Sequence, residues 1–72
     1  MSKAIEQIVN AYVRLGDRRR LEDLLTHRRK LAIDLKMKSG FDFGLLISQV
    51  EEEIAAIEAA IERLEANKTS GN

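Results

Sequence analysis

Basic side chains are concentrated in residues 16–32, whose sequence is GDRRRLEDLLTHRRKLA. This stretch contains five arginines, a lysine and the only histidine of the chain. Side chains of this kind bind the phosphate groups of nucleic acids when they line up along one surface. They also form the ordinary polar coat of a helix that packs against an acidic neighbour. The location of the opposite charges distinguishes the two interpretations.

The acidic side chains are concentrated in the second half of the chain. Residues 18–38 hold eight basic and three acidic side chains, a net charge of +5, and residues 42–67 hold one basic and seven acidic side chains, a net charge of −6. Glu51, Glu58 and Glu65 recur every seven residues, which places them along one flank of a helical interface. We therefore predict that the basic stretch mainly faces this acidic segment, within one chain or between two copies.

Three basic residues support the alternative of nucleic-acid binding. In a helix, Arg18, Arg29 and Lys36 fall within roughly 20° of one line, and such a stripe can follow a phosphate backbone. However, Glu22 lies almost on the same line, and Tyr12 is the only aromatic side chain near enough to stack on a base. The sequence favours charge balance, and a nucleic-acid-binding dimer that uses this stripe is the alternative function.

No other group of residues predicts catalysis or metal binding. His27 has Asp23 one turn earlier but no candidate nucleophile, so we predict a surface hydrogen bond rather than a catalytic base. The run Glu51-Glu52-Glu53 cannot converge on one metal ion, because consecutive residues of a helix point about 100° apart. Cysteine is absent, which excludes disulfides and thiolate catalysis. We expect a protein without enzymatic activity, cofactor or metal.

The composition predicts an all-α protein. Proline is absent, and the abundant Ala, Leu, Ile, Glu, Arg and Lys favour helix almost everywhere. Glycines and their polar neighbours divide the chain into three helices, expected at about 3–15, 18–38 and 43–66. The short connection between the last two forces them into an antiparallel helical hairpin, to which the first adds a short N-terminal helix. We expect one helical domain at 1–66 and a disordered polar tail at 67–72.

Apolar residues repeat with the spacing of a coiled coil in both helices of the expected hairpin. From Phe43 to Leu64 they are separated alternately by four and three residues, and the middle helix repeats the pattern with one interruption at Arg28. The residues predicted to form the core or an interface are Leu21, Leu24, Leu31, Leu35, Ile47, Val50, Ile54, Ile57, Ile61 and Leu64.

Local signals mark the two junctions between helices. Asp42 can cap the last helix, and Phe41 and Leu46 can form a hydrophobic staple across its start. At the first junction, Gly16 and Asp17 separate two apolar faces that would lie about 120° apart on one straight helix. One straight helix cannot bury both faces against the same neighbour. We therefore predict a break at this glycine, with a continuous bent helix as the alternative.

Arg28 stands in the centre of the apolar face of the middle helix, where a leucine would be expected. An unpaired charge is too costly to bury, so the guanidinium must reach water or an acidic partner. We expect the side chain to extend past the apolar seam into solvent. The alternative is a buried pair with Glu51, Glu53 or Glu58 that fixes the register or the number of chains.

The apolar surface exceeds what two helices can bury. Leu25, Ala32, Leu45 and Leu46 widen the apolar stripes, and the first helix adds another face. Either this helix folds back onto the hairpin, or two chains associate. We expect a small non-catalytic interaction protein that completes a helical bundle as a homodimer or binds another helical protein. Because we find neither a membrane-spanning segment nor the apolar run of a signal peptide, we expect a cytoplasmic location.

Overall fold

The computed structural model consists of three α-helices and describes residues 3–38 and 42–70, with side chains as far as residue 66. Helix α1 spans Lys3–Leu15, α2 spans Arg18–Met37 and α3 spans Gly44–Ser70. No strand occurs in these ranges. The prediction of an all-α protein is confirmed.

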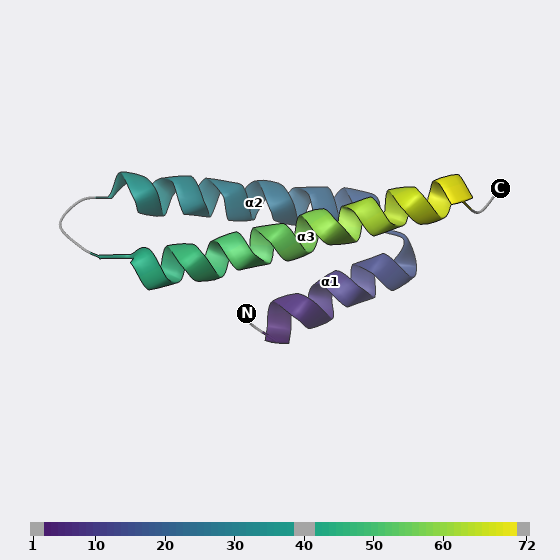
Figure 1. The fold of residues 1–72 in the computed structure, drawn as a ribbon, viewed down its shortest axis with the longest axis horizontal. Helices are drawn as coiled ribbons and strands as arrows, with labels where there is room; N and C mark the ends of the chain where they lie inside the picture. The colour runs from purple at the N-terminus through teal and green to yellow at the C-terminus, as the bar shows by residue number, and fades with distance from the viewer. Residues whose placement is uncertain (1–2, 39–41, 71–72) are drawn as a thin grey trace.

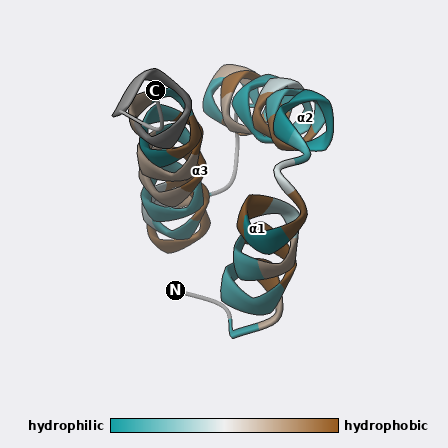
Figure 2. Ribbon diagram, turned by 90° about the vertical axis from the view of Figure 1, so that its right-hand side faces the viewer, coloured by the Kyte–Doolittle hydropathy of each residue, from teal (hydrophilic) through white to brown (hydrophobic). Residues whose placement is uncertain are grey.

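The two longer helices, α2 and α3, lie side by side and antiparallel, as their short connection requires (Figure 1). α1 turns back along the hairpin and packs near the beginning of α2 and the later part of α3. An end-on view shows α1 next to both other helices (Figure 2). We call α1 with residues 18–28 and 55–66 the three-helix half, and residues 29–37 and 44–54 the two-helix half.

A two-residue corner joins α1 to α2. Gly16 has a φ of 66°, in the left-handed region that ends many helices. Its N–H donates to the carbonyl of Val13 at 3.1 Å, and the N–H of Asp17 donates to the carbonyl of Tyr12 at 2.9 Å, which completes a Schellman motif. The Asp17 carboxylate accepts a hydrogen bond from the backbone N–H of Arg20 at 3.2 Å and caps α2. The predicted break is confirmed.

The ends of α3 differ from the predicted ends. The Asp42 carboxylate accepts a hydrogen bond from the N–H of Gly44 at 2.9 Å, so its capping role is confirmed. The predicted staple involves Phe41, which lies outside the described residues. At the other end, the helical backbone continues through Ser70, four residues beyond the predicted end. No glycine or proline precedes Gly71 in this segment, so the sequence contains no strong signal that would end the helix earlier.

The core consists of two apolar clusters, one in each half of the molecule. In the three-helix half, the buried residues are Ile5, Val9, Leu21, Ile57 and Ala60. In the two-helix half, the buried residues are Ala32, Leu35 and Val50, against which Phe43, Ile47 and Ile54 pack while they remain partly exposed. The second cluster is less well covered because α1 does not extend over it.

The residues predicted for the core occupy both buried and partly exposed positions. Leu21, Leu35, Val50 and Ile57 are buried. Leu24, Ile47, Ile54, Ile61 and Leu64 are partly buried. Leu31 is 37% exposed, whereas its neighbour Ala32 is 5% exposed. In the two-helix half, the small side chain therefore faces α3 and the large one lies at the edge.

Candidate interaction surface

A regular series of ion pairs connects α2 to α3. The ammonium group of Lys36 lies 3.0 Å from the Glu51 carboxylate, and the Arg29 guanidinium lies 2.7 Å from the Glu58 carboxylate. The step of seven residues from Lys36 to Arg29 on α2 matches the step of seven from Glu51 to Glu58 on α3. This is the spacing at which flanking residues of two packed helices meet repeatedly. We call this series the charge ladder.

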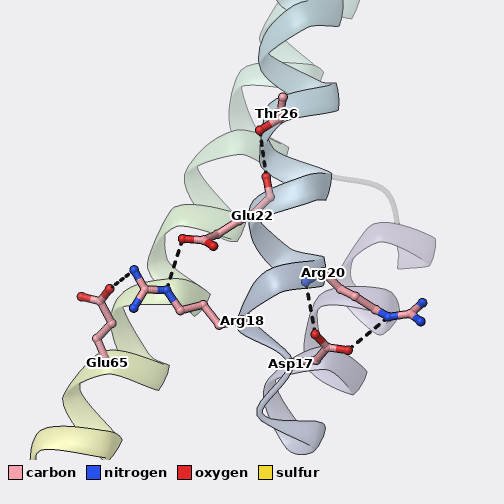
Figure 3. A network of polar contacts seen from close by, with 6 residues as sticks. All are labelled: Asp17, Arg18, Arg20, Glu22, Thr26 and Glu65. Atoms are coloured by element: carbon pink, nitrogen blue, oxygen red, sulfur yellow. Dashed lines mark hydrogen bonds and ion pairs between the residues drawn. The ribbon is translucent and has the colours of Figure 1, made fainter.

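The third position of the charge ladder contains an exception. The next step along α2 is Glu22, which carries the same charge as Glu65 on α3. Arg18 lies one turn earlier, and its guanidinium binds Glu65 and also Glu22 at 3.2 Å (Figure 3). A single arginine thus bridges two carboxylates that would otherwise repel each other. The neighbouring Arg20 is paired separately with Asp17 at 3.1 Å.

The charge ladder contains all three basic residues of the proposed nucleic-acid stripe. Arg18, Arg29 and Lys36 each bind a glutamate of α3, which supports the interpretation that the basic stretch balances the acidic segment. Their side chains remain 48%, 56% and 54% exposed. Because exposed pairs of this kind contribute only about 0–1 kcal/mol each, they specify the register of the hairpin more than its stability.

A second kind of ion pair lies at the boundary between the two halves. The Arg28 guanidinium lies 3.3 Å from the Glu53 carboxylate, and the two side chains are 29% and 9% exposed. Glu53 is the one charged residue classed as buried within the described part of the chain. The structure shows the paired arrangement of Arg28 and not the expected extension into solvent. The burial of Glu53 was missed, although it lies seven residues from both Leu46 and Ala60 on the apolar side of α3.

One side of the two-helix half is open and apolar. Leu31 follows Leu24 by seven residues on α2, and Leu46 precedes Ala60 by fourteen on α3. Leu24 and Ala60 belong to the cluster that α1 covers. Leu31 and Leu46 lie on the same helix faces as these two residues, but beyond the end of α1. Leu46 is 43% exposed, and Leu45 beside it is 77% exposed. We call this surface the open side.

The remaining candidate residues do not form a catalytic or metal-binding site within the described part of the chain. His27 is exposed and forms no hydrogen bond with any described residue, so the prediction of a surface hydrogen bond is wrong. It lines a depression with Tyr12, Arg20, Asp23 and Leu24. An exposed histidine gains little from a carboxylate one turn away when water is available to both. Among the described residues, no three His, Asp or Glu side chains are grouped closely enough to hold a metal ion.

Helices that combine the length and the apolarity of a membrane span are absent from the described residues. Comparisons with protein families, with curated proteins and with solved structures give no match to this chain. The interpretation of its function therefore rests on the open side and on the charges around it.

The pair between Arg28 and Glu53 predicts an unequal response to single and double substitution. Arg28→Leu leaves the Glu53 carboxylate buried without its partner, and we expect the free energy of unfolding to fall by about 3–5 kcal/mol. Arg28→Met combined with Glu53→Leu removes both charges and should restore or exceed the original stability. Urea unfolding followed by circular dichroism measures these differences.

The exposed pair on the charge ladder supplies the control for this comparison. Arg29→Leu should cost no more than about 1 kcal/mol, because Glu58 remains hydrated. Equal losses for Arg28→Leu and Arg29→Leu would contradict the burial of Glu53.

The charge ladder also predicts the behaviour of the protein toward nucleic acids. At about 0.15 M salt we expect duplex DNA or structured RNA to bind only with dissociation constants of roughly 10⁻⁴ to 10⁻⁶ M, as for any basic patch. Replacement of Arg18, Arg29 and Lys36 together by glutamine should weaken the hairpin modestly and remove no specific binding. Nanomolar affinity that the triple substitution abolishes, measured by fluorescence anisotropy, would instead support the nucleic-acid function.

Proposed function

We propose that this chain is a non-catalytic helical interaction module that works as a homodimer, formed through the open side of the two-helix half. The single observation that supports this proposal is the mismatch in helix length. α1 has 13 residues and α3 has 27, which correspond to about 20 Å and 40 Å of helix. Part of the hairpin therefore has no third helix, and Leu31, Leu45 and Leu46 remain exposed there.

A second copy fits the open side in shape. Two hairpins that pack through their two-helix halves place four helices together, and each α1 then lies at an outer end of the assembly. Four antiparallel helices with heptad spacing can cover apolar surface that two helices leave exposed. The pairing is isologous, since the same open side is used by both copies.

Charge does not select the pairing of two copies. The +5 of residues 18–38 and the −6 of residues 42–67 give every copy one basic and one acidic helix. With each α1 at an outer end, the two-fold axis runs across both hairpins and places α2 beside the partner's α2 and α3 beside the partner's α3, so charge does not favour this pairing.

The size of the open side predicts a weak and reversible dimer. About ten residues of each helix lie beyond α1, a surface roughly 15 Å long and 20 Å wide. Its projected area, on the order of 300 Å², is well below the roughly 800 Å² per partner of a stable complex. We expect association to require high protein concentration, and thermal stability to rise with concentration.

The proposal predicts that association requires the exposed Leu46 and does not require the exposed Ile33. Leu46→Glu places a charge on the open side and should abolish dimerisation, as measured by sedimentation equilibrium. Ile33→Glu is the matched control, because Ile33 is also exposed, at 57%, but lies about 160° around α2 from the buried Leu35.

Two results would contradict the proposal. One is a chain that stays monomeric and cooperatively folded at roughly millimolar concentration, where even a weak dimer should form. The other is a dimer that Ile33→Glu disrupts and Leu46→Glu leaves intact, which would place the interface on the outer face of α2.

A further inference from the structure

The corner between α1 and α2 favours glycine at position 16 because of its backbone conformation, and not because a larger side chain would clash there. Gly16 is the one residue with positive φ in the described ranges, and a side chain placed on it would meet no atom within 4 Å. Residues with a side chain avoid this conformation, whereas glycine adopts it readily. A substitution at Gly16 therefore alters the preference for the corner without creating a clash.

α1 is held to the hairpin by apolar packing alone. Ile5 and Val9 are buried together with Leu21, Ile57 and Ala60. No described side chain of α1 forms a hydrogen bond or an ion pair with α2 or α3. The charge ladder, by contrast, ties α2 to α3. α1 is thus the element that can leave its place without breaking a side-chain contact to the hairpin, and only the hydrogen bonds of the corner itself change.

If α1 and α2 formed one straight helix, their apolar faces would point in different directions and could pack against two different molecules. If residues 16 and 17 became helical, α1 and α2 would form one helix from Lys3 to Met37, about 52 Å long. Its two apolar faces would lie about 120° apart. One face can remain on the chain's own α3, and the other is then available to a different chain.

We propose that α1 is an exchangeable arm: in a second form of the protein, α1 and α2 are one continuous helix, and α1 fills the groove that another copy's α1 has left. The occupant is a second copy because its α1 carries the sequence that already fits this groove. The apolar contacts are the same in both forms, so the conformation at Gly16, the Asp17 cap of α2 and the protein concentration determine the balance. This interface is separate from the open side.

The test compares two substitutions at Gly16 in chains that also carry Leu46→Glu, which removes the open side as an interface. Gly16→Ala disfavours the left-handed corner and favours helix, whereas Gly16→Asn tolerates the corner better. Because two corners open in each dimer, we expect the dissociation constant of the Gly16→Ala dimer to be lower than that of Gly16→Asn, on the order of 100-fold. Sedimentation equilibrium measures both constants.

Cross-linking identifies which segments meet in the dimer. The chain has no cysteine, so Asn10→Cys and Ala59→Cys each introduce a single thiol, on opposite walls of the cleft between α1 and α3. The two single-cysteine chains, each with Gly16→Ala and Leu46→Glu, are mixed and treated with a short bismaleimide. Exchange predicts a link between the two different chains, and each chain treated alone is the control.

Equal dissociation constants for the two Gly16 variants, or a mixture without a link between the two chains, would overturn the proposal. If Gly16→Ala does not fold, Asp17→Ala tests the same equilibrium, because it removes the cap of α2 and keeps the glycine. Its dissociation constant should fall relative to the chain with Leu46→Glu alone, and an unchanged constant overturns the proposal. Association that Leu46→Glu eliminates in every variant supports the open side as the dimer interface and contradicts exchange of α1.

Discussion

The antiparallel register of α2 and α3 determines which charged side chains of the two helices meet. Lys36 meets Glu51 and Arg29 meets Glu58 at matching steps of seven residues. The same register brings Arg28 to Glu53 at the level where α1 begins. A slip by one turn would separate these pairs and leave Glu53 buried without its partner, which is costly for a charged group. The three weak exposed pairs and the pair of Arg28 with the buried Glu53 therefore specify the same alignment.

The short length of α1 gives the molecule two different halves. Where α1 is present, Leu21, Ile57 and Ala60 are fully covered. Beyond it, Leu46, fourteen residues before Ala60, is 43% exposed, and Leu31, seven residues after Leu24, is 37% exposed. A chain of 72 residues buries only about 60% of its unfolded surface, so an additional contact in the open half has a large relative effect on stability. The proposed dimer follows from this unequal coverage.

Local sequence signals predicted the elements well. The glycine at position 16, the cap at Asp42 and the heptad spacing are properties of neighbouring residues, and the helices and their junctions follow them. The exposure and the partners of individual side chains around each helix were harder to predict. The exposure of Leu31 depends on how far α1 reaches, and the bridging role of Arg18 depends on the residue opposite Glu22.

The burial of Glu53 is a further property that the local sequence pattern did not predict. Its position between Leu46 and Ala60 on α3 was visible in the sequence, but three successive glutamates are typical of a solvated face. Only the packed structure distinguishes the buried Glu53 from Glu51 and Glu52, which are exposed. Such distinctions depend on tertiary contacts that local patterns do not contain.

The central claim is that α1 stabilises one half of the hairpin and that association covers the other. Amide hydrogen exchange, measured by mass spectrometry at increasing protein concentration, tests it most directly because it reports local opening along each helix. In dilute solution, residues 29–37 and 44–54 should exchange faster than residues 18–28 and 55–66. As the concentration rises, protection should increase mainly in the first pair of segments. Uniform protection of both halves, independent of concentration, would contradict the account.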